Sequence, residues 1–240
     1  MRLSVIIPAY NEGKRIEKTL NEINAYLSIQ DYDYEIIVVS DGSKDNTVDV
    51  VWRLSETIPH LRVIENKKNN GKGYVVRQGM LEAVGDYRLF LDADHSTSID
   101  HMERVWPQLE EDYDVVICSR DLEGSVLAVP QPFWRRKLGD AFNLLVQVTS
   151  GLWGMWDTQC GFKVFTAASA KRIFSTTTIN RWAFDVEVLV LAKQYGFSVK
   201  EIPVTWVNSA QSKVNIKGMV QMIVEIAVIR LNMEKKEKAP

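Results

Sequence analysis

Five short runs of almost continuous apolar and β-branched residues recur through the first 120 positions of the chain. Runs that are apolar on both faces are typical of strands inside a parallel sheet covered on both sides. The stretches between them carry apolar residues at spacings of three and four, as in Ile16, Leu20, Ile23 and Leu27, which predicts helices. The predicted strands are 3–8, 35–40, 61–65, 87–92 and 114–119.

Strand and helix alternate in this half, so it predicts an α/β fold with an open, mostly parallel sheet, right-handed crossovers and flanking helices. In such sheets ligands bind beyond the carboxyl ends of the strands. The segments that follow the predicted strands are rich in polar side chains, which indicates one crevice that gathers them. These segments are "AYNE", "DGS", "NNGKG", "DAD" and "RD".

Asp92 and Asp94 stand at the end of the fourth predicted strand. Two carboxylates at the mouth of a buried strand are costly unless a cation neutralises them. Carboxylate oxygens are hard ligands, which favour Mg²⁺ or Mn²⁺. The pair therefore predicts a metal site, although an Asp that caps a turn followed by an Asp that caps the next helix would give the same spacing.

The other strand ends offer groups that suit a nucleotide. Pro8 stiffens the exit of the first strand, Tyr10 presents an aromatic face, and Glu12 supplies an acceptor for a pyrimidine edge or a ribose hydroxyl. Each of these signals is weak alone: Glu12 also fits a helix start, Asp41 fits ordinary turn chemistry, and Lys72 fits a solvated lysine. The chain has neither G-x-G-x-x-G after its first strand nor a P-loop motif, which argues against a dehydrogenase or a P-loop enzyme.

The second half of the chain carries amphipathic patterns. Apolar residues at spacings of three and four over 132–156 predict a helix or helix pair. Arg135, Arg136 and Lys137 lie at its start, where they suit a phosphate or anionic lipid headgroups. The alternative is that this apolar stripe packs under the sheet. Asp185 and Glu187 open a further apolar helix, and compensation of the helix dipole explains both.

The C-terminal region predicts one more strand over 199–208 and a lid over 205–218. The apolar run at 219–231 is interrupted by Gln221, Glu225 and Arg230, so it is not expected to cross a bilayer. The formal charge of −2 gives no global attraction to nucleic acid. Cys118 and Cys160 are expected to be free thiols in a reducing compartment.

Eight segments together resemble the family 2 inverting glycosyltransferases, in the branch of the dolichyl-phosphate glucosyltransferases and mannose synthases. The resemblance covers residues 3 to about 230 and leans toward the glucosyltransferases through "DTQCGFK" and "RWAFDVE". The other segments are "SVIIPAYNE", "EIIVVSDGSKDNT", "NNGKGYVVRQGM", "FLDADHST", "CSRD" and "VKEIPVTWVN…SKV". It implies a GT-A fold, a nucleotide-sugar donor with UDP-glucose favoured, Mg²⁺ or Mn²⁺, and a polyprenyl phosphate acceptor at a membrane surface.

The resemblance also implies roles for individual residues. Asp94 holds the metal with Asp92, and Arg120 and Lys72 approach the donor phosphates. The donor-binding positions are Pro8, Tyr10, Glu12, Val39, Asp41, Lys72, Asp92, Ala93 and Lys213. Asp157 orients the acceptor or serves as its base, although a plain turn Asp is the alternative. Ser96 departs from the mannose synthases, which often carry a glutamine ligand there, and His95 is expected beside the site rather than on the metal.

The reaction expected from this resemblance is a single displacement that inverts the sugar. A phosphate monoester has a second pKa of about 6, so at neutral pH it is already a competent nucleophile. Residues 1–129 are expected to bind the donor and 130–240 the acceptor within one continuous domain. The protein is expected at the cytoplasmic face of a membrane, with an anchoring partner or as a homo-oligomer. Transfer to a soluble saccharide or protein, use of GDP-mannose, and nucleotide binding without catalysis are the alternatives.

Overall fold

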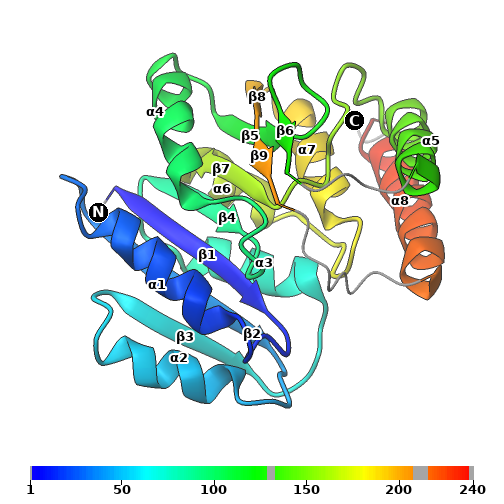
Figure 1. Cartoon of the computed structure of the whole chain (residues 1–240). Coiled ribbons are helices and arrows are strands. Elements are labelled where there is room, and N and C mark those ends of the chain that lie inside the picture. Colours follow the sequence, from blue (N-terminus) through cyan, green and yellow to red (C-terminus); the bar gives the residue numbers. More distant parts are fainter. Residues whose placement is uncertain (1, 129–132, 208–215, 238–240) are drawn as a thin grey trace.

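A computed structural model describes residues 2–128, 133–207 and 216–237 of the chain (Figure 1). The first half alternates strand and helix as predicted. Its elements are β1 (Leu3–Ala9), α1 (Ile16–Leu27), β2 (Tyr34–Asp41), α2 (Thr47–Ser55), β3 (Leu61–Asn66), α3 (Lys72–Glu82), β4 (Tyr87–Leu91), the short 3₁₀ helix η1 (Ile99–His101), α4 (Met102–Glu110) and β5 (Val115–Ser119). The five predicted strands are thus confirmed to within one residue at either end.

The second half adds strands and helices to the same sheet. Its elements are β6 (Val126–Leu127), α5 (Phe133–Ser150), β7 (Phe162–Thr166), α6 (Ala167–Phe174), α7 (Phe184–Gln194), β8 (Val199–Pro203), β9 (Thr205–Trp206) and α8 (Ile216–Glu237). The sheet order is β3-β2-β1-β4-β7-β5-β8, and β6 pairs with β9 in a separate two-stranded sheet. Every pairing in the large sheet is parallel except those of β7, which runs antiparallel to β4 and β5. The prediction of a mostly parallel sheet is confirmed.

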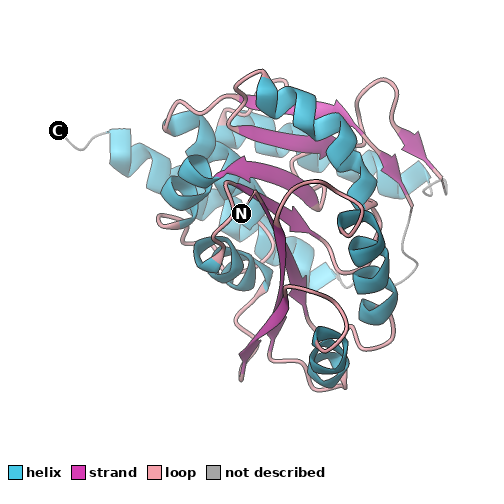
Figure 2. Cartoon of the chain, turned by 90° about the vertical axis from the view of Figure 1, so that its left-hand side faces the viewer, coloured by secondary structure: helices cyan, strands magenta, loops and turns pink. Residues whose placement is uncertain are grey.

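Helices cover both faces of the sheet (Figure 2). The apolar stripes of α1, α2 and α4 form one core with alternate residues of the strands. The helices α3, α6 and α7 form the second core on the opposite face, together with buried residues of α5 and α8. Ile16, Leu20, Ile23 and Leu27 of α1 are fully buried, as their spacing predicts. Truncating one of them to Ala would destabilise the fold by about 2–5 kcal/mol.

Three expectations for the second half need correction. The helix predicted over 132–156 ends at Ser150, because Gly151 adopts a φ of 66° that an L side chain rarely takes. The single strand expected over 199–208 is two strands, β8 and β9, that belong to different sheets. Strand β7 had no counterpart among the predictions. Residues 208–215, which make up most of the expected lid, lie outside the described residues.

Among the described helices, none combines the length and apolar character needed to cross a membrane. Both cysteines are buried free thiols, as predicted, and burial raises the pKa of Cys160 to about 12.

Candidate active site

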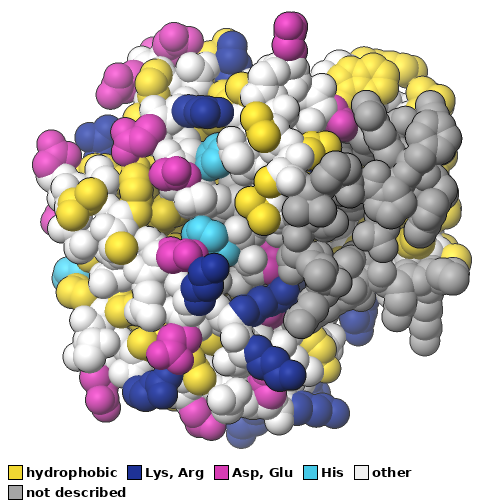
Figure 3. Space-filling model, viewed as in Figure 1, with side chains coloured by type: hydrophobic (Ala, Val, Ile, Leu, Met, Phe, Trp, Pro, Cys, Tyr) yellow, Lys and Arg dark blue, Asp and Glu magenta, His cyan; other side chains and the backbone are white. Residues whose placement is uncertain are grey.

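Loops from the carboxyl ends of β1 and β2 are tied together at one edge of the sheet. The Asn11 side chain accepts a hydrogen bond from the Lys44 N–H at 2.8 Å, while its own N–H donates to Ser43 at 3.1 Å. The Glu12 N–H donates to the Thr47 hydroxyl at 2.8 Å. On the molecular face in Figure 3, acidic and basic side chains lie intermixed around these loops. Hydrogen bonds therefore hold the loops after β1 and β2 together at the predicted edge of the crevice.

Asp41 holds the glycine-rich loop that precedes α3. Its carboxylate accepts the backbone N–H groups of Asn70 at 2.7 Å and Gly71 at 3.0 Å. Burial raises the pKa of Asp41, and these two hydrogen bonds offset part of the rise. Gly71 has a φ of 108°, and a Cβ there would lie 2.3 Å from the Asn180 carbonyl oxygen, so only glycine fits. The sequence placed Asp41 at the donor site but gave no sign of this structural task.

Lys72, the first residue of α3, forms an ion pair with Asp92 beyond the end of β4. The Lys72 Nζ and Asp92 Oδ1 atoms are 2.6 Å apart. Burial lowers the pKa of Lys72, but the charges of Asp92 and other carboxylates nearby raise it more. Burial also raises the pKa of Asp92, which the Lys72 charge offsets only in part. The backbone N–H groups of Gly73 and Tyr74 donate to the carbonyls of Arg181 and Asn180, so these two groups are not available to an anion. An anion at this end of α3 would therefore bind the Lys72 ammonium.

The loop around Asp94 is fixed from several sides. An Asp94 carboxylate oxygen accepts the Ser96 N–H at 3.0 Å, and the Ser96 carbonyl accepts the Val207 N–H at 2.9 Å. The charges of Asp92 and Asp94 both raise the pKa of Lys72. Gly161 packs closely against the Asp92 carboxylate, because a Cβ at this position would lie 2.0 Å from Asp92 Oδ2.

Arg120 and Asp157 form a second ion pair at the end of β5. The guanidinium binds the carboxylate with two hydrogen bonds of 2.7 Å, and the Arg120 N–H adds a third of 2.9 Å. Burial would raise the pKa of Asp157, but Arg120 outweighs it and holds the pKa below its usual value. The Arg120 guanidinium also lies 5.4 Å from the centre of the Trp206 ring. A carboxylate in this state is a poor proton acceptor, which favours positioning over general-base work for Asp157.

The remaining donor-binding predictions fall at the same edge. Pro8 and Val39 pair with each other across β1 and β2, and both are buried. Ala93 is buried, and its carbonyl accepts the Thr19 hydroxyl at 2.9 Å. Tyr10 is half-buried at the rim. Their roles stay predictions.

Glu12, predicted to accept a hydrogen bond from the donor, pairs with Arg15 in the turn before α1. The Arg15 guanidinium makes two hydrogen bonds to the Glu12 carboxylate. The hydrogen bond to Glu12 raises the pKa of Arg15, and the charges of Asp94 and Asp92 raise it further against the effect of burial. Arg15 therefore directs positive charge toward the aspartate pair. A basic residue three positions after Glu12 was the available signal, and the predictions did not use it.

The residues fit a divalent cation through Asp94. Asp92 is already paired with Lys72, and among the described residues no three His, Cys, Asp or Glu side chains lie close enough to hold a metal ion. Asp94 would therefore be the protein ligand of such a cation, with further oxygens supplied by other groups. The metal role predicted for Asp92 stays a prediction, and its carboxylate is paired with Lys72.

Two acidic residues of α7 have specific partners. Asp185 and Glu187 lie in the first turn of this helix, as expected. Asp185 accepts a hydrogen bond from the buried Lys163 at 2.5 Å. Glu187 accepts the N–H groups of Thr178 and Ile179 and so shapes the loop before the helix.

One half-buried acid was not predicted at all. Glu201 on β8 has a buried carboxylate oxygen, Oε1, without a hydrogen-bond partner among the described residues. Burial and the charges of Asp157 and Asp121 raise the pKa of Glu201 to about 7.

Four predicted site residues cannot be placed. The helix α5 includes positions 135–137, but the side chains of Arg135, Arg136 and Lys137 lie outside the described part, as does Lys213 entirely. His95 lies beside the site, with its Nε2 3.0 Å from a Glu22 carboxylate oxygen.

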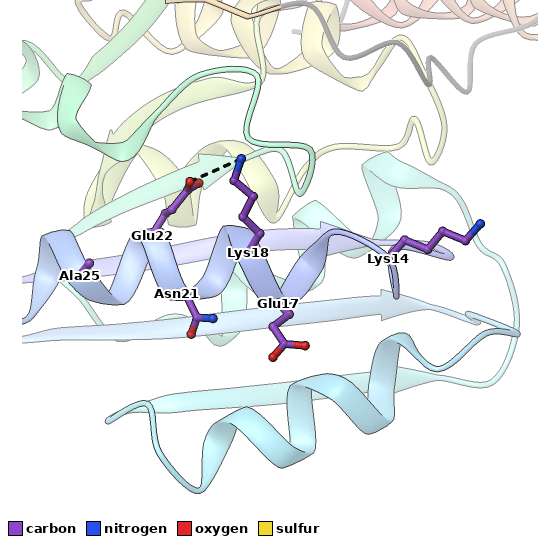
Figure 4. A pocket seen from close by; sticks show the side chains of 6 residues that line it. All are labelled: Lys14, Glu17, Lys18, Asn21, Glu22 and Ala25. Atoms are coloured by element: carbon purple, nitrogen blue, oxygen red, sulfur yellow. Dashed lines mark ion pairs between the residues drawn. The ribbon is translucent and has the colours of Figure 1, made fainter.

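The exposed side of α1 forms a shallow hollow lined by Lys14, Glu17, Lys18, Asn21, Glu22 and Ala25 (Figure 4). The side chains of Lys18 and Glu22 form an ion pair of 3.8 Å across it. Its charges are balanced and its lining comes from one helix and the turn before it, so the strand-end crevice remains the candidate site.

Comparison with known proteins agrees with this geometry. The family model described as glycosyl transferase family 2 matches residues 4–173, and the chain belongs to this family. It is 38% identical over 237 residues to a dolichyl-phosphate beta-glucosyltransferase of Trichomonas vaginalis, a match that covers 94% of this chain and 70% of the relative. The identity to the dolichyl-phosphate beta-glucosyltransferase of Homo sapiens is 35%, with 96% and 75% covered. The resemblance read from the sequence motifs is confirmed.

The solved structures most like this fold include glucosyl-3-phosphoglycerate synthase from Mycobacterium tuberculosis in complex with Mn²⁺, uridine diphosphate and glucosyl-3-phosphoglycerate. The TM-score is 0.69 at 18% sequence identity, with 96% of this chain and 79% of that chain covered. The likeness confirms the GT-A fold.

Proposed function

We propose that this chain transfers a glucosyl group from a nucleotide sugar, with UDP-glucose favoured, to the phosphate of a dolichyl or related polyprenyl phosphate. The observation that carries the proposal is a pair of ion pairs, Lys72–Asp92 after β4 and Arg120–Asp157 after β5, at one edge of a GT-A sheet. The chain resembles dolichyl-phosphate beta-glucosyltransferases over most of its length. That edge offers both a carboxylate for a divalent cation and fixed cations for phosphate groups.

The donor diphosphate is assigned to the space between Lys72 and Arg120. A divalent cation held by Asp94 supplies charge stabilisation for the departing nucleotide. Lys72 and Arg120 add fixed positive charge that needs no reorganisation during the reaction. The backbone at Pro8 and Val39 and the ring of Tyr10 bound the side of the crevice assigned to the base and ribose.

The acceptor phosphate needs no strong base. Because its second pKa is about 6, it is mostly a dianion at neutral pH. The bidentate pair with Arg120 keeps Asp157 ionised and occupied, which supports a positioning role for this carboxylate. Attack by the phosphate oxygen opposite the leaving diphosphate inverts the anomeric carbon, and the new bond forms as the sugar–diphosphate bond breaks.

The acceptor's lipid chain is assigned to the exposed faces of α5 and α8, which pack side by side (Figure 1). Helix α8 buries Met222, Ile226 and Ile229 and leaves a second apolar stripe in solvent. The exposed apolar residues of these two helices are Leu144, Leu145, Val148, Val220, Ile223, Val224, Val228 and Leu231. Trp153 and Trp156 are also exposed, in the segment that follows α5. Exposed aliphatic and aromatic side chains suit the interface of a lipid bilayer.

The test uses purified full-length chain with Mn²⁺, dolichyl phosphate in detergent and labelled UDP-glucose. Glucosyl phosphoryl dolichol should form, and UDP-N-acetylglucosamine and GDP-mannose should give little product. Asp94→Asn should remove activity, whereas Asp31→Asn, an equal charge change on the exposed loop before β2, should not. Transfer undiminished in Asp94→Asn, or transfer only to soluble saccharides, would refute the proposal.

Flotation with vesicles of anionic phospholipid tests the lipid surface separately. Val224, which is 58% exposed, and Ile223, which is 51% exposed, should each weaken vesicle binding when changed to Gln. Ile29→Gln is the matched control, because Ile29 is 81% exposed just beyond the end of α1, outside α5 and α8. Equal vesicle binding by all three variants would contradict the assignment.

A further inference from the structure

A buried ion pair lies directly behind the aspartate pair. Lys163 on β7 is 1% exposed, and its ammonium donates to Asp185 at 2.5 Å and to the Cys160 carbonyl at 2.6 Å. Asp185 is 4% exposed in the first turn of α7. Removing two charges from water is costly, and apolar replacements of buried pairs often fold as well, so stability alone does not account for this pair.

This pair sits beside the Lys72–Asp92 pair, and both lie against the same aromatic ring. The Lys72 Nζ is 5.0 Å and the Lys163 Nζ is 5.7 Å from the centre of the Phe90 ring. Lys72 also lies 5.8 Å from the ring of Phe184, the residue before Asp185. The cations of two ion pairs therefore lie beside one aromatic ring.

The arrangement brings a second carboxylate near Lys72, because its Nζ lies against the ring of Phe184, the residue before Asp185. Lys72 pairs with Asp92 at 2.6 Å, while Asp185 is bound by Lys163 at 2.5 Å. The charge of Asp185 still acts on both Lys72 and Asp92. A lysine side chain has four rotatable methylenes, so small rotations carry its ammonium from one acceptor toward the other.

We propose that Lys163 is a positioning residue: by neutralising Asp185, it keeps the ammonium of Lys72 on Asp92, at the end of the crevice that receives the donor diphosphate. Lys72 then partly neutralises Asp92, so a divalent cation alone binds weakly and binds well together with the nucleotide. This inference rests on the proposed donor site. Its new residues are Lys163 and Asp185, to which the proposed reaction assigns no contact.

The decisive variant is Lys163→Met, which keeps the length of the side chain and removes its charge. Asp185 is then unpaired in the core and recruits Lys72 from Asp92. Affinity for Mn²⁺ alone should rise about tenfold, because Asp92 regains its full charge beside Asp94. Affinity for UDP should fall about tenfold or more, because a charge-assisted contact from Lys72 is lost.

Two further variants separate positioning from a merely structural role. Lys163→Met with Asp185→Asn removes the competitor, so both affinities should return to within about threefold of wild type. Asp185→Asn alone should leave Lys72 on Asp92 and both affinities unchanged. The measurements are Mn²⁺ binding by electron paramagnetic resonance and UDP binding by calorimetry, with thermal unfolding as the folding control.

Equal loss of UDP binding in Lys163→Met and in the double variant would overturn the inference, as would unchanged Mn²⁺ and UDP affinities in folded Lys163→Met. If Lys163→Met does not fold, Asp185→Asn and the double variant decide the question. A tenfold loss of UDP binding in Asp185→Asn would overturn the inference. UDP binding retained in Asp185→Asn, with folding and UDP binding restored in the double variant, would support it. Neither assay needs an acceptor. A wild type that binds Mn²⁺ and UDP but transfers no glucose therefore refutes the proposed function and leaves this inference standing.

Discussion

Asp157→Asn should destabilise the protein more than any exposed acidic substitution. Asp157 is 2% exposed and Arg120 is 27% exposed at the side chain. The change keeps the shape of the side chain but removes the charge that receives two guanidinium hydrogen bonds and one backbone N–H. Breaking a buried pair by removing one partner costs about 3–5 kcal/mol, because the remaining charge is left uncompensated.

The assay is urea unfolding of wild type and Asp157→Asn, with Asp31→Asn as the exposed control. For a domain of this size, the expected loss corresponds to a fall in melting temperature of roughly 6–20 °C. The pH dependence gives a second check. Arg120 holds the folded-state pKa of Asp157 below its unfolded value of about 3.9, so the pair's contribution is complete above that value and is lost as pH falls through the folded pKa.

The difference between wild type and Asp157→Asn should therefore be constant from pH 5 to 8 and shrink in acid. A loss of less than about 1 kcal/mol at neutral pH would show that the pair is not the buried anchor described here. A stable variant that had lost only transfer would instead identify Asp157 as a base.

Three other outcomes follow from the structure. Gly161→Ala should displace Asp92 and reduce transfer, because the new Cβ would lie 2.0 Å from Asp92 Oδ2. Gly139→Ala is the control and should keep activity, because no atom lies within 4 Å of its new Cβ. Equal activity of the two variants would contradict this packing. Glu201→Gln should raise the free energy of unfolding by about 1–2 kcal/mol over wild type at pH 8 and leave it unchanged at pH 4. The folded-state pKa of Glu201 is raised to about 7, so the wild-type protein is destabilised as the pH rises above the unfolded-state pKa of this carboxyl. Urea unfolding at both pH values tests this, and a gain that did not depend on pH would refute it. Chelation of divalent cations should stop transfer while leaving the melting temperature without nucleotide nearly unchanged, since no three metal-ligating side chains lie together among the described residues. A large fall in melting temperature would contradict this.

The sequence revealed the sheet through its continuous apolar strands, and the crevice through the polar segments after them. It did not reveal β7, because Lys163 interrupts the apolar run "FKVF" and its partner Asp185 is 22 residues away. Periodicity reports which face of an element is buried, but it carries no information on which distant charge meets which. For the same reason, Arg120 and Asp157 were both selected while their pairing, 37 residues apart, was not foreseen.

The position of β7 also shapes how the chain can fold during synthesis. The sheet neighbours of β5 are β7 and β8, and both are encoded after it. Strands β1 to β4 can pair as soon as about 90 residues have left the ribosome, but β5 has no strand to join until residues 162–166 follow. For that interval the apolar segment 115–119 has no edge partner, and unpaired strand edges favour aggregation of the nascent chain.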